Sequence, residues 1–125
     1  MGRIASRDLA ETAKGAKIII AGRDEKKAKE YAKKLGKNVV GIAADATKPA
    51  ELSVLLEKYS VDVVVNCSLY YYNLDVMKAC LQAGCNYLDL GGLFHMTRRQ
   101  LKLHSQFKKK KLLAVLGCGS TPGIT

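Results

Sequence analysis

Segments with the pattern of buried strands alternate with segments of helical periodicity along the whole chain, with a repeat of roughly 25 residues. The strand segments are short apolar runs, as expected for strands that are buried on both faces of a sheet. They cover residues 18–20, 38–43, 61–66, 87–90 and 112–116. Strands that alternate with helices form parallel sheets with right-handed crossovers. The sequence therefore predicts an α/β fold, a Rossmann-like three-layer sandwich with a parallel sheet.

The helical segments between these strands carry recognisable start and stop residues. Asp24 and Gly36 have the residue types of an N-terminal cap and a C-terminal stop. Pro49 suits the first turn of the next helix, with Thr47 as its cap. Thr121-Pro122 has the same pattern, which predicts that another helix begins near the end of the sequence. The expected helices cover residues 4–13, 24–35, 48 onwards, 73–84 and 96–111.

Gly2 stands at the start of the first helical segment. In the dinucleotide-binding fingerprint G-x-G-x-x-G, the third glycine lets the helix pack closely on its strand, and the first two form the phosphate turn. We interpret Gly2 as the third glycine, so the first strand of the usual fold and most of the phosphate loop are expected to be missing. Because that strand is central in the order 3-2-1-4-5-6, strands 18–20 and 61–66 would face a gap. Either these strands close up, a partner supplies a strand, or the chain is a fragment of a longer protein, which we favour.

Size and composition limit the class of protein. The length of 125 residues suits one domain with its own core, which we place over residues 1–125. No apolar run approaches the roughly 18 residues that cross a bilayer, and the N-terminus lacks a signal-peptide pattern. The four cysteines show no C-x-x-C pair and no metal-ligand spacing with either histidine. These features predict a cytoplasmic protein with reduced thiols, no bound metal and no membrane contact.

The net charge is +10 at pH 7. An excess of this size could indicate a nucleic-acid partner. The basic residues are spread over positions 14–37 and 98–111, mostly on predicted helices, and Lys108 to Lys111 is the one dense run. Cations at the carboxyl end of a helix are stabilised by the helix dipole. We therefore favour solvated helix surfaces over a nucleic-acid site.

Arg23 follows the strand of residues 18–20, and ligands of open parallel sheets bind beyond the carboxyl ends of the strands. In NAD-binding sites an acidic residue at this point binds the ribose 2′-hydroxyl group. Gly22 occupies that position and leaves space, while Arg23 could pair with a 2′-phosphate. The pattern favours NADP over NAD, with a solvated loop cation as the alternative for Arg23.

Polar and aromatic residues follow the next two strands. Asp45 could accept a hydrogen bond from an adenine amino group, or it could merely order the loop before the next helix. Asn66, Cys67 and Ser68 lead into three consecutive tyrosines at positions 70–72. Tyrosines at this edge suit the wall of a ribose or nicotinamide site. Packing of the tyrosines against a neighbouring domain is an equally good explanation.

Glycine-rich loops follow the last two strands. Asp89 to Gly92 combines one carboxylate with close backbone approach, and Gly117-Cys118-Gly119 repeats the glycine pattern. His95 is a candidate general acid or base near this edge, whereas His104 is expected on the surface. We assign no catalytic residue. The residues expected to contact the cofactor are Gly2, Arg3, Gly22, Arg23, Asp24, Asp45, Ala46, Asn66, Cys67, Ser68 and Asp89.

The order and spacing of these motifs resemble the N-terminal cofactor domain of the saccharopine dehydrogenase family. Each motif is weak alone, but together they extend over nearly the whole chain. The matching motifs are Gly2-Arg3-Ile4-Ala5, Ala21-Gly22-Arg23-Asp24, Asp45-Ala46-Thr47, Val63-Val64-Val65-Asn66, Tyr87-Leu88-Asp89-Leu90, and Leu116-Gly117-Cys118-Gly119 with Pro122-Gly123-Ile124-Thr125.

The resemblance implies a two-domain, NAD(P)-dependent oxidoreductase that transfers hydride at a C–N bond of amino-acid-derived secondary amines, as in lysine metabolism. The chain would be the cofactor half, with a substrate domain after Thr125 and an amino-acid substrate in the full-length protein. The resemblance also allows a homodimer. Without its first strand and the substrate domain, the chain alone is expected to be inactive. A non-catalytic dinucleotide-binding or regulatory module is the alternative.

Overall fold

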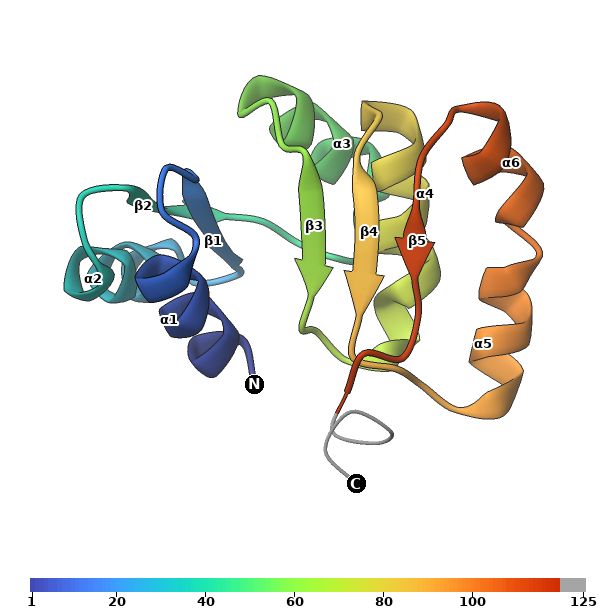
Figure 1. Cartoon of the computed structure of the whole chain (residues 1–125), viewed down its shortest axis with the longest axis horizontal. Helices are drawn as coiled ribbons and strands as arrows, with labels where there is room; N and C mark the ends of the chain where they lie inside the picture. The colour runs from blue at the N-terminus through green and yellow to red at the C-terminus, as the bar shows by residue number, and fades with distance from the viewer. Residues whose placement is uncertain (120–125) are drawn as a thin grey trace. The chain divides into compact units, whose positions relative to one another are not determined.

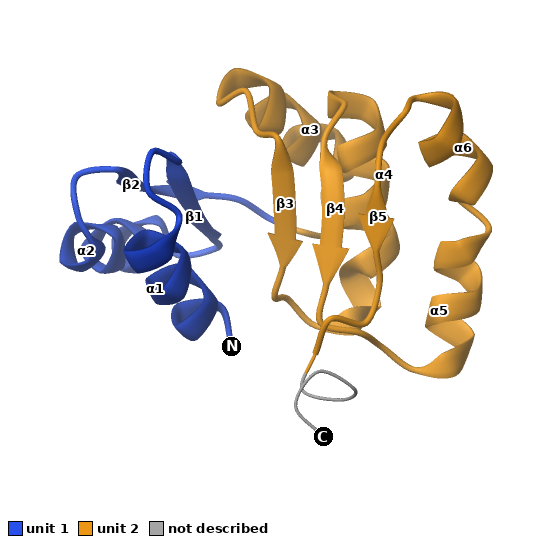
Figure 2. Cartoon of the chain, in the orientation of Figure 1, with its two compact units in different colours: residues 1–45 blue, residues 46–125 orange. Residues whose placement is uncertain are grey.

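The computed structural model describes residues 1–119, and the chain divides into two compact units (Figure 2). The first unit, Met1–Asp45, contains α1 (Gly2–Thr12), β1 (Ile18–Gly22), α2 (Glu25–Leu35) and β2 (Val39–Ala43). The second unit, Ala46–Thr125, contains α3 (Pro49–Lys58), β3 (Val63–Asn66), the 3₁₀ turn η1 (Tyr70–Tyr72), α4 (Asn73–Ala83), β4 (Asn86–Asp89), α5 (Phe94–Leu101), α6 (His104–Lys109) and β5 (Ala114–Val115). The strands and helices alternate as the sequence predicts.

In the first unit, β1 and β2 pair in parallel over their full lengths, and α2 connects them. The helix packs on β2 through its two buried alanines, Ala28 and Ala32. Gly41 makes this approach possible, because a Cβ atom at position 41 would overlap the backbone of Ala28. Three small residues therefore decide how closely the crossover helix lies on its strand.

In the second unit, β3, β4 and β5 form a parallel sheet in that order. Helices α3 and α4 cover one face of this sheet (Figure 1). The core lies between α4 and the strands and includes the buried side chains of Val76, Met77, Cys80 and Tyr87. Gly84 ends α4 in the left-handed conformation (φ 78°), as its position in the sequence predicts.

The start residues of α2 and α3 only partly follow the sequence pattern. The carboxylate of Asp24 accepts the backbone N–H of Lys27 at 3.1 Å, which confirms Asp24 as the cap of α2. Pro49 occupies the first turn of α3, as predicted. The cap position, however, belongs to Lys48 and not to Thr47, and no side chain caps this helix. The fixed backbone of Pro49 provides the helix start without a side-chain acceptor.

The strand pairings confirm the predicted α/β class, because every pair is parallel. The five strands form two separate ladders, whereas the sequence pattern indicates one sheet. Among residues 1–119, β1 pairs only with β2, and β3 pairs only with β4. These are the two strands that the usual central strand would separate. The break between the ladders therefore falls where the sequence predicted a gap.

The segment 96–111 forms two helices where one was expected. The break lies at Lys102 and Leu103, whose backbone N–H groups bond the carbonyl groups of Arg99 and Gln100, respectively. These bonds span three residues, so the chain tightens into a 3₁₀-like turn at this point. Helices α5 and α6 consequently have separate axes.

Helix length also bears on the membrane prediction. Within residues 1–119 no helix is both long and apolar enough to cross a bilayer. The helix start predicted at Thr121-Pro122 lies outside the described residues.

Candidate functional site

Arg23 directly follows the carboxyl end of β1 and is exposed. Its guanidinium group takes part in no ion pair or hydrogen bond with residues 1–119. A Cβ atom at the preceding Gly22 would meet no other atom within 4 Å, so the space beside the strand end is open. Asp24, by contrast, caps α2 and lies 3.8 Å from the Lys27 ammonium group. Of these loop residues, Arg23 is the cation available to an anion.

A hollow of about 430 Å³ lies at the opposite end of the first unit's strands. It is lined by residues just before β1 and at or just before the start of β2, including Lys17 and Lys37. Ligands of parallel sheets bind at the carboxyl ends, and this hollow lies at the amino ends. We therefore place the candidate site at the Arg23 loop on the geometry of the strands.

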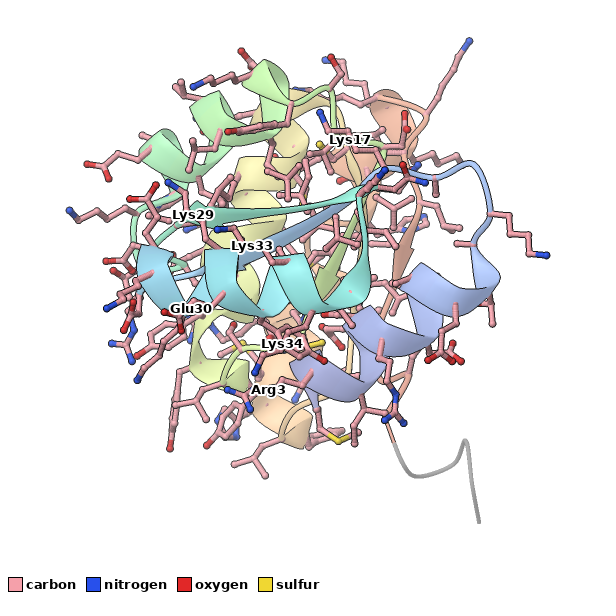
Figure 3. The ribbon with its side chains drawn as sticks, turned by 90° about the vertical axis from the view of Figure 1, so that its left-hand side faces the viewer. Arg3, Lys17, Lys29, Glu30, Lys33 and Lys34 are labelled. Atoms are coloured by element: carbon pink, nitrogen blue, oxygen red, sulfur yellow. The ribbon has the colours of Figure 1, made fainter. Side chains whose placement is uncertain are left out.

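Lysines project from the exposed side of α2, as Figure 3 shows for Lys29, Lys33 and Lys34. The Lys29 ammonium group lies 2.6 Å from the Glu25 carboxylate one turn earlier, and both side chains are more than half exposed. Lys33 and Lys34 stand in the last turn, where the helix dipole favours cations. This arrangement supports solvated helix surfaces as the source of the high net charge.

Arg3 connects α1 to α2 within the first unit. Its backbone carbonyl group accepts the hydroxyl of Tyr31 at 2.6 Å, and its guanidinium carbon lies 5.4 Å from the centre of the Tyr31 ring. Met1 precedes the helix without a side-chain cap, so the amides of the first turn, at Gly2 and Arg3, are available to a ligand. The side chain of Arg3 therefore has a packing partner, whereas Gly2 presents backbone alone.

Asp89 ends β4 and is buried, with 1% of its surface exposed. Its Oδ1 atom accepts the backbone N–H groups of Gly91 and Gly117, both at 2.8 Å. Its Oδ2 atom accepts the hydroxyl of Tyr87 at 2.9 Å and the side-chain amide of Gln100 at 2.7 Å. Four donors thus surround one carboxylate at the carboxyl edge of the second unit's sheet.

Asn66 ends β3 and extends this network to the next loop. Its side-chain amide donates to the Tyr87 hydroxyl at 3.2 Å and to Oδ1 of Asn73 at 3.0 Å. Its Oδ1 atom accepts the backbone N–H of Ser68 at 3.1 Å and the Ser68 hydroxyl at 2.6 Å. Asn66 is therefore buried and engaged, whereas Ser68 is exposed and Cys67 is half-buried.

The direction of each hydrogen bond in this network follows from its neighbours. The single hydroxyl proton of Tyr87 goes to Asp89, so the Tyr87 oxygen must accept from Asn66. Asn66 then also donates to Asn73, which must present its oxygen atom. The Nδ2 group of Asn73 is left without a partner among the described residues, close to Gly92. Rotating the Asn73 amide by about 180° would place its Nδ2 group against the Nδ2 group of Asn66, so two donors would face each other.

Three members of this network, Tyr87, Asn73 and Gln100, were not predicted from the sequence. Two signals were present in the sequence. Tyr87 and Asp89 are two residues apart in a strand, so their side chains lie on the same face. Gln100 follows Met96 by four residues, which puts a polar residue on the buried stripe of α5. Neither signal identifies the partner of either side chain.

The remaining candidate functional residues are cysteines and histidines. Burial raises the pKa of Cys67, and it raises the pKa of the fully buried Cys80 to about 12. Cys118 is exposed, and its backbone N–H donates to the Asp89 carbonyl at 2.8 Å. His95 and His104 are exposed. Residues 1–119 contain no group of three side chains suited to a metal ion.

Apolar side chains are exposed beside this edge. They belong to η1 with its flank and to the start of α5, and they are Leu69, Tyr71, Leu93 and Phe94. The rings of Tyr70 and Tyr71 lie 4.1 Å apart between centroids. The two segments adjoin, because a Cβ atom at Gly92 would lie 3.1 Å from Cβ of Tyr70. This surface suits a flat ring or a second apolar surface.

The sequence of this chain is similar to those of known proteins. The family model described as the saccharopine dehydrogenase NADP binding domain matches residues 1–115. Carboxyaminopropylagmatine dehydrogenase of Synechocystis sp. is 34% identical over 116 residues, which cover 86% of this chain. The trans-acting enoyl reductase of Mycobacterium tuberculosis is 29% identical over 122 residues, which cover 94% of this chain. The chain spans 29% of the length of each of these relatives.

A solved structure agrees in fold. Apo saccharopine dehydrogenase (L-Glu forming) from Saccharomyces cerevisiae superposes with a TM-score of 0.80 at 22% identity, covering 98% of this chain and 26% of that chain. The family model is an NADP-binding domain, which confirms NADP as the predicted cofactor at the level of the family. The chain belongs to the saccharopine dehydrogenase NADP-binding domain family.

Proposed function

We propose that the chain is the NADP-binding part of an oxidoreductase that acts on a C–N bond of an amino-acid-derived secondary amine, as in lysine metabolism. The family model and the Synechocystis relative, a dehydrogenase named for an agmatine derivative, support this assignment. The bound nicotinamide would supply or accept the hydride. The residues of this chain would bind and orient the cofactor, and a further domain would hold the substrate.

One observation carries the proposal: the free guanidinium group of Arg23 beside the open position at Gly22. An acidic side chain at position 22 would repel a 2′-phosphate, whereas glycine leaves space for it. Arg23 can offer paired N–H donors in the planar geometry that phosphate oxygens accept. In this proposal Asp24 keeps its place as helix cap, and Gly2 and Arg3 offer backbone amides to an anion.

In the second unit we propose the loop after β3 as a contact with the dinucleotide. Ser68 is exposed and held by Asn66, so its hydroxyl has a defined position. Cys67 is half-buried, and Tyr70 and Tyr71 provide adjoining aromatic surfaces. The loop offers one fixed hydroxyl and one flat apolar wall, which suits a ribose next to a nicotinamide ring.

Titration of the chain with NADPH and NADH, followed by nicotinamide fluorescence, tests the proposal. We expect weak binding with a preference for NADPH. Arg23→Ala should weaken NADPH binding by about ten- to a hundredfold, because a charge-assisted phosphate contact contributes roughly 1.5–3 kcal/mol. Lys26→Ala is the matched control, since Lys26 is an exposed cation in the first turn of α2. Equal losses for NADPH and NADH would make Arg23 a structural residue and remove the support for this site.

Reduction of an enoyl group is a second candidate. The mycobacterial relatives are named trans-acting enoyl reductases. The four exposed apolar side chains beside the second unit's carboxyl edge, Phe94 among them, suit an acyl chain better than a polar amine. An enoyl thioester that binds the wild-type chain in the presence of NADPH, but not Phe94→Ala, would favour this candidate. No binding of the enoyl thioester, or equal binding by Phe94→Ala, would remove the support for this second candidate.

A further inference from the structure

Strand β4 carries a bridging side chain at each end. At its first residue, the Asn86 amide donates to the Asp62 carbonyl at 3.3 Å, and its oxygen accepts the Leu113 N–H at 2.9 Å. At its last residue, Asp89 accepts the N–H of Gly117 at 2.8 Å. Both residues therefore connect β4 to the segment that carries β5. Asn86 lies at the amino end, away from the ligand edge, and Asp89 lies at the carboxyl end.

Asp89 differs from Asn86 in the number of loops that meet at it. Gly91 and Gly117 belong to the loops after β4 and β5, and both have positive φ angles, 106° and 77°. This conformation, which favours glycine, turns both N–H groups toward the same carboxylate oxygen. A Cβ atom at Gly91 would lie 3.4 Å from Cα of Gly117, so the two loops touch.

The third loop, which follows β3, is connected to Asp89 through a relay of two side chains, Tyr87 and Asn66. The Tyr87 hydroxyl donates to Asp89 and accepts from Asn66, and Asn66 holds both the N–H and the hydroxyl of Ser68. Gln100 of α5 donates to the same oxygen of Asp89 as Tyr87 does. One buried carboxylate thus connects the loops that follow β3, β4 and β5.

Asp89 has no capacity left for a ligand. Its side chain is 1% exposed, and each oxygen already accepts two hydrogen bonds. A contact with the cofactor would require the loss of one of these donors, which would leave a buried N–H or hydroxyl group unpaired. Asp89 can therefore influence a ligand only through the loops that it holds.

We propose that Asp89 is a positioning residue: it sets the mutual positions of the three loops at the carboxyl edge of the second unit, and through them the affinity for the dinucleotide. The proposal rests on the proposed function, because it concerns binding of the same dinucleotide. A carboxylate fits this role since four donors need four acceptor positions, and a neutral amide has a single oxygen atom. Four fixed N–H and O–H groups also stabilise its charge.

A second substitution, at Gln100, can compensate for removal of the Asp89 carboxylate. In Asp89→Asn, the new amide oxygen can still accept the two glycine N–H groups, but the new NH₂ group meets two donors from Tyr87 and Gln100. Adding Gln100→Glu replaces one of these donors by an acceptor, and it restores the negative charge next to the same position. Tyr87→Phe separates the relay from the rest. It removes the hydroxyl between Asn66 and Asp89, and it leaves the two glycine N–H groups and Gln100 bonded to Asp89.

The experiment compares NADPH titrations and thermal unfolding of the wild-type chain, Asp89→Asn, Asp89→Asn/Gln100→Glu and the control Asn86→Ala. Asp89→Asn should raise the Kd for NADPH about tenfold, and the double variant should recover most of this loss. Asn86→Ala should lower the melting temperature and leave the Kd within about twofold, because its bonds lie at the other end of β4. Equal increases of Kd in Asp89→Asn and Asn86→Ala, or no rescue, would overturn the proposal.

NMR spectra of the free chain provide a readout that does not depend on NADPH. Asp89→Asn should shift the amide signals of Gly91, Gly117 and Ser68 together, whereas Tyr87→Phe should shift Ser68 and leave the two glycines nearly unchanged. An unchanged Ser68 signal in both variants would overturn the relay even where both proteins fold. A wild-type chain that shows these couplings but binds no NADPH would contradict the proposed function and leave the positioning role of Asp89 intact.

Discussion

The hydroxyl of Tyr87 donates to the carboxylate of Asp89 at 2.9 Å, although both residues belong to one strand of four residues. Alternate residues of a strand point to the same face, so both side chains lie on the buried face of β4. Burial of two polar groups side by side is stable because each completes the hydrogen bonds of the other. This pair is the centre of the second unit's carboxyl edge.

Loss of the Tyr87 hydroxyl should destabilise the fold. Tyr87→Phe removes one donor from Asp89 and one acceptor from Asn66, both of which are buried. We expect the free energy of unfolding to fall by about 1–3 kcal/mol, measured by urea denaturation. Tyr72→Phe is the matched control, because Tyr72 is only half-buried and should change stability by less than about 0.5 kcal/mol. Similar losses in both variants would contradict the special role of the buried hydroxyl.

A methyl group at position 41 should disrupt the first unit. The Cβ atom of Gly41→Ala would overlap the Ala28 backbone, so α2 must move away from β2. We expect a loss of about 1–3 kcal/mol or failure to fold, measured by circular dichroism and urea denaturation. Gly22→Ala in the neighbouring strand should change stability by less than about 1 kcal/mol, because its Cβ atom meets open space. Tolerance of alanine at position 41 would show that the helix lies farther from the strand.

Stability should fall at alkaline pH through Cys80. Burial raises the pKa of this thiol from 9.0 to about 12, so the folded chain keeps a proton that the unfolded chain loses above pH 9. The contribution to stability is therefore complete below pH 9 and disappears as the pH rises toward 12. Urea denaturation with a reductant present measures this slope from about pH 8, roughly one unit below the window, to about pH 11, within it. Cys80→Ala should flatten the slope, whereas Cys118→Ala, at an exposed position, should not.

The chain alone should show no dehydrogenase turnover. Hydride transfer needs a substrate held within roughly 3–3.5 Å of the nicotinamide carbon in an oriented cleft. The chain spans 29% of the length of its curated relatives, and in the proposed function the substrate is held by a further domain. The purified chain is incubated with NADP and saccharopine, or with NADPH, lysine and an oxo-acid, and nicotinamide absorbance is followed. A clear rate that depends on the chain would overturn this expectation and direct attention to His95 and Cys118.

The sequence predicts much of the fold because its signals are local. Short apolar runs between helices indicate parallel strands, and Asp24 before a helical segment indicates a cap that the structure confirms. The ligand edge also follows from sequence, since residues after parallel strands gather at one edge. The separation of the strands into two ladders lies between β1 and β3, where the interpretation of Gly2 predicts a gap.

The hydrogen bonds at the carboxyl edge of the second unit join residues that are far apart in the sequence. Gln100 meets Asp89 through the packing of α5, eleven positions further along the chain, and no periodicity identifies that pair. Asn66 meets Tyr87 across 21 positions. The break between α5 and α6 depends on a tightened turn at Lys102 and Leu103, residues without a strong preference for stopping a helix. Contacts of this kind depend on tertiary packing and require a structure.

Strand β3 pairs on one side only among the described residues, and its Val63 and Val65 side chains are 49% and 37% exposed. A short valine-rich strand with unused backbone donors and acceptors is a template for other extended chains. Solubility of the isolated chain therefore depends on repulsion between molecules that each carry a net charge of +10. Added salt screens that repulsion and leaves the valines unchanged. We therefore expect the isolated chain to aggregate more strongly as the ionic strength rises. A complex with nucleic acid would show the opposite behaviour, because added salt dissociates it.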